Sequence, residues 1–466
     1  MERRLYRYFF IWVVLTEIII LCKYIFDMPH SLLICSSLMC GILFILIYPY
    51  KHKLKHLNFK KIKRYLYNCS IQIIVSFIMG ILIITAGINL GEMAYILLGL
   101  IIAVLIPSFW LLVKKEYRKL FLDAVSLGTV IVFILITILS IVFVPLSNTQ
   151  YSSIIGNPNE FGNILVFSLC CILYRYNITK KNIYVFFATI NISFAILSIS
   201  RTTYLCIIAI ITINLIYYFI IYEYKKLIIN VLKVILVFLF SFLMLFALLT
   251  SGNSLIRSLE KQILGSEYVY YAKLYKYDGS KMGFNDLFEY IELRTLKGIS
   301  TDNKKNEDVD IEDVDINEMS SGRVEIWKDF FDNIKLYGHN IGEKVYIKST
   351  NQYGLDAHNT YLNNGYYYGC ISGATVIIYM IILLYFNFIK LIILIKTKKE
   401  DPEFYFMSMI FVSFSILSIL SSVFSPFHSM IAFGFWFICF YYRKDYSLNL
   451  NGGMRINSCM DKISEG

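Results

Sequence analysis

The sequence contains no C-x-x-C pair, and none of its 10 cysteines falls within residues 251–357. Without cysteine, that segment cannot be crosslinked by internal disulfide bonds. Without a C-x-x-C pair, the chain lacks the cysteine pattern typical of zinc and redox sites. Most of the cysteines lie inside apolar runs instead. We expect them to act there as small apolar fillers in helix packing.

Charged residues are also scarce, at 17% of the chain, whereas hydrophobic residues make up 57% and the mean hydropathy is +0.61. Repeated apolar runs of about 20 residues are long enough to cross a bilayer as helices. The sequence therefore predicts an all-α polytopic membrane protein with about twelve transmembrane helices. The expected spans are 8–25, 31–50, 67–89, 93–113, 120–145, 161–175, 183–200, 203–222, 227–250, 360–394, 404–424 and 428–442.

Lysine and arginine cluster in alternate connections between these spans, and positive flanks stay on the cytoplasmic side during insertion. The short connections on the opposite side contain only Arg201. This predicts that both termini are cytoplasmic. The first apolar run lacks a small-x-small cleavage site, so we expect an uncleaved helix. The predicted parts are helices 1–9 (1–250), a large outer loop (251–357), helices 10–12 (358–442) and a cytoplasmic tail (443–466).

The formal net charge of +11 divides between the two sides of the membrane. The outer loop has 14 Lys and Arg against 19 Asp and Glu, while the rest of the chain has 30 against 14. The positive excess therefore follows from membrane topology, and it indicates no nucleic-acid partner.

The middle of the outer loop carries a tandem acidic pentapeptide, Glu307–Ile311 repeated as Glu312–Ile316. Such carboxylates can bind calcium, but the glycine and the ligand spacing of an EF-hand loop are missing. We expect a solvated insertion and no metal site. Residues 251–298 mix tyrosines with charges, which is typical of short amphipathic elements at a membrane surface.

Residues Ser320 to Gly338 are predicted to form a helix, with Ser321 as N-cap and Gly338 as its C-terminal stop. Arg323 then stands in the first turn, where the helix dipole disfavours a cation. Either an anionic partner offsets that cost or solvent screens it. The apolar face of this helix is formed by Val324, Trp327, Phe331 and Ile334.

His358 lies where the outer loop meets the next apolar span, between Asp356 and Asn359. These neighbours can orient the imidazole and keep it as a base near neutral pH. The alternative is that His358 and Asn359 only cap the helix that follows. That helix opens with two overlapping G-x-x-x-G steps over Gly365–Gly373, which chiefly indicate close helix packing.

Arg201 sits between two apolar spans, and no acidic residue lies within four positions of it. A cation there is costly unless it pairs elsewhere in the fold, faces water or binds an anionic ligand.

Another outer connection, Asn157–Asn159, is explained by turn and N-cap chemistry. Together with Glu160 it could also line a polar cavity. Glu17 inside the first span stays unassigned.

Four fragments in this order resemble the O-antigen ligase and O-antigen polymerase superfamily. They are Asn-Pro-Asn at a helix start, Ser-x-Ser-Arg-Thr between helices, Ser-Gly-Arg in a long outer loop, and Ala-His-Asn-Thr-Tyr-Leu before a glycine-rich helix. Here these fragments are Asn157–Asn159, Ser198–Thr202, Ser321–Arg323 and Ala357–Leu362. The resemblance spans roughly residues 150–440.

The resemblance implies a metal-independent glycosyltransferase without a cofactor, in the cytoplasmic membrane of a bacterium. Its sugar donor would be a glycan on a polyprenyl diphosphate, used at the outer face. His358 would activate the acceptor hydroxyl, and Arg201 with Arg323 would hold the diphosphate. Two features depart from the pattern, namely His339 where relatives are glycine-rich and the acidic insertion at 307–318. Further candidate substrate-binding residues are Asn159, His339, Asn359 and Tyr361.

Within that superfamily we favour a polymerase of lipid-linked repeat units for O-antigen, capsule or other exopolysaccharide. The alternative is a ligase that passes the glycan to a lipid A core or another acceptor. A lipid-linked oligosaccharide flippase is a further alternative, but it should carry cations in many spans and have short loops throughout. Expected partners are the bilayer, polyprenyl-diphosphate glycans, and a chain-length regulator and flippase of the same pathway.

Overall fold

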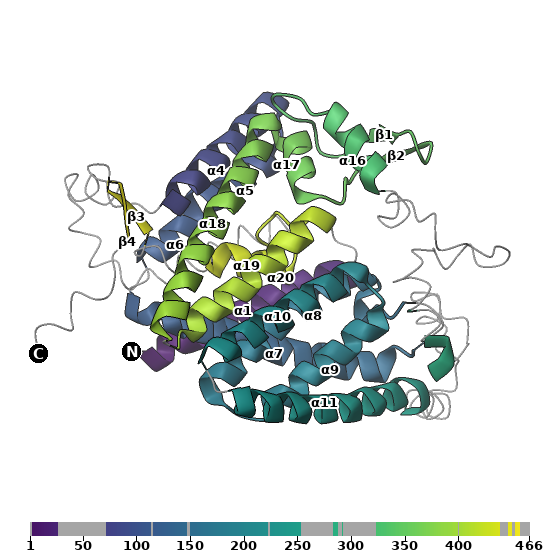
Figure 1. The fold of residues 1–466 in the computed structure, drawn as a ribbon. Coiled ribbons are helices and arrows are strands. Elements are labelled where there is room, and N and C mark those ends of the chain that lie inside the picture. Colours follow the sequence, from purple (N-terminus) through teal and green to yellow (C-terminus); the bar gives the residue numbers. More distant parts are fainter. Residues whose placement is uncertain are drawn as a thin grey trace, which may run out of the picture.

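The computed structural model describes residues 2–26, 71–112, 115–146, 150–221, 224–252, 283–287, 291, 323–398, 400–438, 446–449 and 453–456 (Figure 1). Some predicted features lie outside these residues. They are the span at 31–50, most of the outer loop before residue 323 with its acidic segment at 307–318, and the N-cap Ser321.

Helices make up most of the described chain. Eight of the described helices are long and apolar enough to cross a membrane, and two shorter apolar helical segments accompany them. The prediction of an α-helical multi-pass membrane protein is confirmed at this level, and the number of twelve spans stays a prediction. The long helices are α1 (Glu2–Phe26), α4 (Ile71–Leu90), α7 (Lys115–Phe143), α8 (Pro158–Thr179), α10 (Arg201–Ile221), α11 (Tyr224–Ala247), α18 (Cys370–Thr397) and α19 (Pro402–Leu420).

The predicted span at 93–113 contains a π-turn. It consists of α5 (Met93–Leu100), the π-turn η2 (Ile101–Leu105) and α6 (Ile106–Leu112). Pro107 accounts for the interruption, because it has no N–H and its ring would clash with the carbonyl four residues earlier. The π-turn accommodates the proline without ending the helix.

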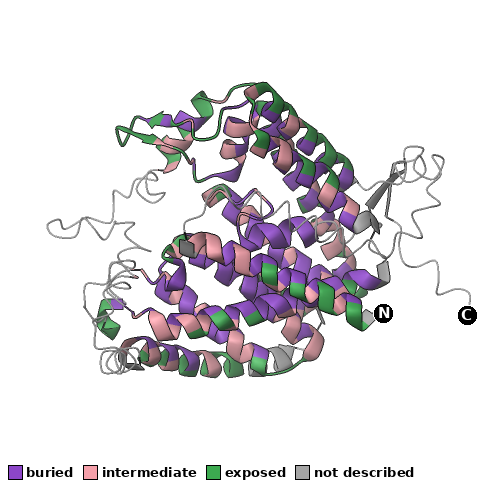
Figure 2. Cartoon of the chain, turned by 180° about the vertical axis from the view of Figure 1, so that it is seen from behind, coloured by how far each residue is buried: buried purple, intermediate pink, exposed green. Residues whose placement is uncertain are grey.

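The buried centre lies where α1, α7, α8, α19 and α20 (Met430–Ile438) meet (Figure 2). Aromatic rings fill it: the Trp12 centroid is 5.4 Å from that of Phe433 and 5.2 Å from that of Phe437. Edge-to-face contact of this kind stabilises ring pairs beyond the area they bury. The remaining shorter apolar helix, α9 (Ile183–Ser198), packs between α8 and α11.

α11 is the outermost helix of this group, and the π-turn η4 (Leu248–Gly252) follows it (Figure 1). Its outer face is apolar yet exposed, with Leu236 at 69% and Phe240 at 64% of full exposure. A soluble protein rarely exposes such a continuous apolar surface, whereas a bilayer solvates it.

The end of the predicted outer loop forms a small folded unit. It contains α16 (Arg323–Asp332) and an antiparallel hairpin of β1 (Val345–Ile347) and β2 (Gln352–Gly354), in which Val345 pairs with Gly354. Its core consists of Phe330, Val345, Ala357 and Tyr366. A second antiparallel hairpin, β3 (Tyr446–Asn449) and β4 (Gly453–Ile456), lies in the predicted tail.

Two sequence expectations are wrong in this region. The helix predicted to reach Gly338 ends at Asp332, and the span predicted at 360–394 is two helices, α17 (Thr360–Tyr368) and α18, separated at Gly369. Both glycines have positive φ, +84° at Gly338 and +93° at Gly369.

Backbone contacts explain the break between α17 and α18 and the conformation of Gly338. A Cβ on Gly338 would lie 2.1 Å from the Tyr367 carbonyl oxygen, and one on Gly369 would lie 2.1 Å from that of Leu336. The segment that follows α16 therefore lies directly against the α17–α18 junction. Only glycine allows two backbones to come this close. The G-x-x-x-G steps accordingly pack α17 against α18: a Cβ on Gly373 would lie 2.8 Å from the Gly365 Cα.

Candidate functional site

Asn157 is the N-cap of α8. The Asn157 Oδ1 accepts the backbone N–H groups of Asn159 at 2.9 Å and Glu160 at 3.3 Å, and Pro158 occupies the first turn. This is the turn and cap chemistry predicted from the sequence. The Asn159 side chain in turn accepts a hydrogen bond from Ser200 Oγ at 3.1 Å. The predicted residue Asn159 thus joins the start of α8 to the turn before α10.

Arg201 is the first residue of α10 and is partly buried. The turn before it is tight, because Ile199 adopts a left-handed conformation with φ +49° and donates its N–H to the Ile196 carbonyl at 3.2 Å. Ser198 and Ser200 are buried in this turn. The fold therefore fixes Arg201 at the positive end of a helix dipole, a region that attracts anions.

Arg323 is the first residue of α16 and lies within electrostatic range of both Arg201 and Asp356. Burial lowers the pKa of the Arg323 guanidinium, the Arg201 charge lowers it further, and Asp356 acts in the opposite direction. Two arginines about 120 residues apart in the chain, both selected from the sequence, thus lie within electrostatic range of each other. Their mutual repulsion favours a ligand that carries negative charge.

His358 is held by its neighbour Asp356. Its backbone N–H donates to Asp356 Oδ1 at 2.7 Å, and its Nδ1 lies 3.7 Å from Asp356 Oδ2. The residue adopts a left-handed conformation, φ +51°, and its side chain is 53% exposed. The imidazole is therefore accessible, has a carboxylate beside it, and does not cap α17.

Asp356 is itself fixed by hydrogen bonds. Its carboxylate accepts from the Asn363 amide at 2.6 Å and from the Ser422 hydroxyl. Burial acts to raise the pKa of Asp356, but His358 and these hydrogen bonds outweigh it, so the pKa lies below its usual value. The group remains a carboxylate wherever it has to support the imidazole.

Asn359 is the N-cap of α17, as the alternative reading of the sequence proposed. Its Oδ1 accepts the N–H groups of Tyr361 at 3.0 Å and Leu362 at 3.1 Å, and its amide donates to the Ile419 carbonyl at 3.0 Å. The side chain is buried and fixes the start of α17 against the end of α19. Tyr361, on the first turn, is partly buried beside Ser418 of α19. Contact of either residue with a substrate stays a prediction.

His339 is buried away from solvent, with 4% of its side chain exposed. Its ring stacks on Tyr366 at 3.9 Å, and its two nitrogens lie 2.7 Å from the Asn333 carbonyl and 2.7 Å from Glu343 Oε1. Its carbonyl accepts the Tyr95 hydroxyl at 2.9 Å. These contacts attach the outer unit to α5 and α17, and a role for His339 in substrate binding stays a prediction.

Three residues that sequence reasoning did not select complete the cluster. Lys23 Nζ lies 3.2 Å from His428 Nδ1, and the Tyr24 hydroxyl donates to the His428 carbonyl at 2.7 Å. Glu160 lies within electrostatic range of all three, and Asp356 within range of His428. The signals in the sequence were a lysine in the last turn of the first span and a histidine on the predicted outer side. The pairing itself joins positions 405 residues apart.

The site thus gathers the ends of α1, α8, α10 and α16 with the connections before α17 and α20. Within the described residues, no group of three or more His, Cys, Asp or Glu side chains is arranged to hold a metal ion. What the cluster offers is two guanidiniums, an imidazole with its carboxylate, and a lysine–histidine pair. Comparison with protein families, with characterised proteins and with solved structures gives no match.

Proposed function

We propose that this chain is a membrane glycosyltransferase. It would join oligosaccharide repeat units carried on a polyprenyl diphosphate, at the outer face of a bacterial cytoplasmic membrane. The observation that carries the proposal is the proximity of Arg201 and Arg323 to one another and to the Asp356–His358 pair. The resemblance of the four sequence fragments to O-antigen ligases and polymerases gives this proximity its chemical interpretation.

The arginines suit the donor end of the reaction. When the anomeric carbon separates from the diphosphate, negative charge builds on the leaving oxygen, and guanidinium groups bind such oxygens through paired hydrogen bonds. Arg201 and Arg323 both begin helices, and the first turn of a helix carries free backbone N–H groups that attract an anion. When the bond from the anomeric carbon to the diphosphate breaks, the charged diphosphate would then remain bound at this site.

The Asp356–His358 pair suits the acceptor end. Nε2 of His358 would take the proton from the attacking hydroxyl, while the Asp356 carboxylate stabilises the imidazolium that forms. A positioned base of this kind typically contributes a factor of about 10² to 10⁴ in rate. The exposure of the imidazole leaves room for a hydroxyl to approach.

The orientation in the membrane belongs to the same proposal. Both termini would be cytoplasmic, so the ends of α1, α8 and α10 that bear the site would face outward, together with α16 and the β1–β2 hairpin. The distribution of lysine and arginine between alternate connections supports this arrangement.

The test uses the purified full-length protein in lipid nanodiscs, supplied with a synthetic polyprenyl-diphosphate repeat unit. Lipid-linked products lengthened by whole repeats are expected from the wild type. His358→Ala should slow extension by about 10² to 10⁴, the usual contribution of a general base. Arg201→Ala should slow diphosphate release, while Lys344→Ala, an exposed residue of the same outer unit, should behave as the wild type.

The products distinguish the alternatives. Full activity in His358→Ala would contradict the assignment of the base. Transfer to a lipid A core without any extension would identify a ligase. Movement of the lipid-linked unit across the membrane with no bond formed would identify a flippase.

A further inference from the structure

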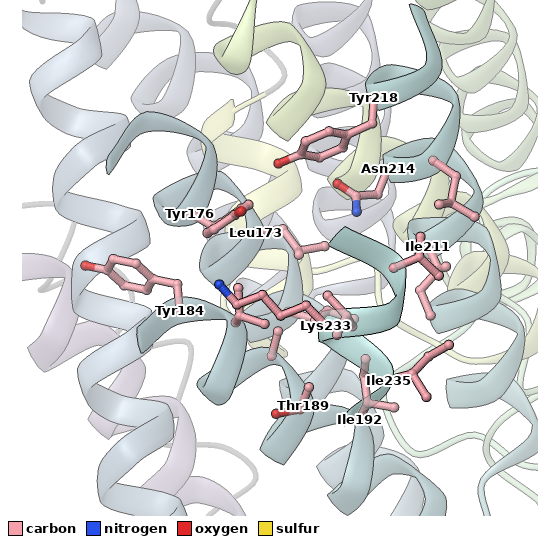
Figure 3. Close-up of a pocket in the computed structure, with 16 residues that line it drawn as sticks. Leu173, Tyr176, Tyr184, Thr189, Ile192, Ile211, Asn214, Tyr218, Lys233 and Ile235 are labelled. Carbon is pink, nitrogen blue, oxygen red and sulfur yellow. The ribbon is translucent and has the colours of Figure 1, made fainter. Parts of the chain in front are cut away.

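A cavity of about 300 Å³ lies among α8, α9, α10 and α11, away from the polar cluster (Figure 3). We call it the α10–α11 groove. It is lined from Ile211 onward on α10, whereas Arg201 of the candidate site begins the same helix. The groove and the candidate site therefore occupy opposite halves of α10. Ligand binding in the groove can therefore be tested separately from the proposed enzyme activity.

The groove forms because α11 packs against α9 and makes few contacts with α10. A hydrogen bond of 2.9 Å between Thr189 of α9 and Ser241 of α11 ties those two helices together. α10 and α11, in contrast, contact each other at few positions. Residues of α9 line the bottom of the groove between α10 and α11. The groove opens beside the exposed apolar face of α11.

One end of the groove is polar. Lys233 lies nine residues into α11, yet its Nζ reaches Asn182 Oδ1 in the turn between α8 and α9, at 2.9 Å. Helical side chains tilt toward the helix N-terminus, so a lysine here extends back toward the start of α11. In Figure 3 its stem crosses the groove, and its nitrogen points toward Tyr184 and Tyr176.

The other end is apolar, lined by Ile192, Ile211 and Ile235. The groove is thus amphipathic along its length, with a cation and tyrosine hydroxyls at the end nearest the α8–α9 turn and aliphatic side chains deeper in the helix layer. Its volume is at the lower limit for small-molecule sites, about 300 to 1,000 Å³, which suits one hydrocarbon chain rather than a whole lipid.

We propose that the α10–α11 groove binds one acyl chain of an anionic glycerophospholipid, with the lipid phosphate on Lys233. Charge complementarity favours this occupant, because Lys180 and Lys181 stand exposed at the same turn as Asn182. The sequence places this turn on the cytoplasmic side, where anionic lipids concentrate and each nearby cation strengthens their binding. The phosphate replaces Asn182 as the partner of Lys233.

Native mass spectrometry of the purified full-length protein tests this proposal, with dioleoylphosphatidylglycerol and dioleoylphosphatidylcholine as probes. The wild type should retain one phosphatidylglycerol and bind phosphatidylcholine more weakly. Lys233→Gln should lower the affinity for phosphatidylglycerol about fivefold, the effect of removing one cation from an anionic headgroup. Lys233→Arg should retain it.

Two further variants separate the groove from general surface charge. Ala188→Phe places a ring on the α9 floor and should abolish retention of the chain. Lys398→Gln, an exposed cation beyond the end of α18, should leave binding unchanged. Equal retention of both lipids by the wild type would overturn the proposal. So would unchanged phosphatidylglycerol binding in Lys233→Gln, or its displacement by an equimolar polyprenyl phosphate.

Discussion

Arg201 and Arg323 share three features that each disfavour a cation. Each begins a helix, where the dipole disfavours a cation, each is partly buried, and the two lie within range of each other's charge. Asp356 offsets part of this cost at Arg323. In the proposed reaction, the negative charge of a bound diphosphate would offset these costs.

Asp356 offers a test at the scale of a single carboxyl group. Its pKa is lowered in the folded chain, so the ionised form stabilises the fold above the unfolded value of about 3.9, and this stability is lost as the pH falls through the lowered pKa. Asp356→Asn has no charge to lose. Its apparent Tm in detergent should therefore decline less than that of the wild type between about pH 4 and pH 2.

Asp332→Asn serves as the control for that measurement, because Asp332 is exposed at the end of α16. It should follow the wild-type decline. If Asp356→Asn declines as steeply as the wild type, the carboxylate does not hold the His358 region together in the way proposed.

Helices whose bounds depend on neighbouring residues in the sequence were predicted. The helix break that depends on contacts with a distant part of the chain was not. The apolar runs gave α8, α10 and α19 because a helix of about 20 residues satisfies its own backbone within a bilayer. The cap at Asn157 was equally local. The break between α17 and α18 could not be inferred, because a run of tyrosines with one glycine satisfies helical patterning. The break depends on Gly338, which meets Gly369 only in the folded chain.

The same distinction holds within the candidate site. The sequence selected Arg201, Arg323 and His358 by chemical type and position along the chain. It gave no reason to pair Lys23 with His428, since such a contact depends on how α1 packs against α20. It also left His339 ambiguous, because the stacking of its ring on Tyr366 requires the outer unit to be docked.

Gly369→Ala tests the junction between α17 and α18. A Cβ there would meet the Leu336 carbonyl at 2.1 Å, and the backbone at φ +93° disfavours any side chain, so the apparent Tm should fall clearly. Gly342→Ala is a matched control, because Gly342 has a similar φ of +85° but no atom within 4 Å of the added Cβ. Its loss should be limited to about 1 kcal/mol of conformational strain. Equal effects of the two substitutions would show that the backbone contact is not important.

At the scale of the whole molecule, the site and the α10–α11 groove lie on opposite halves of α10. The polar cluster uses the starts of α8 and α10, and the groove uses their later turns with the start of α11. With the proposed orientation, the lipid-linked donor would enter from the outer leaflet and the proposed phospholipid would bind from the inner leaflet.

Site-directed labelling tests that orientation directly. In a background with the native cysteines replaced by serine, Tyr353→Cys places a thiol on the β1–β2 hairpin, where Tyr353 is 68% exposed. Lys398→Cys places one beyond the end of α18, at the opposite surface. A membrane-impermeant maleimide added to cells with a permeabilised outer envelope should label Tyr353→Cys, and it should reach Lys398→Cys only after the cytoplasmic membrane is disrupted. The reverse pattern would place the arginine–histidine site in the cytoplasm, where a donor exported to the outer leaflet could not reach it, and would remove the proposed polymerase activity.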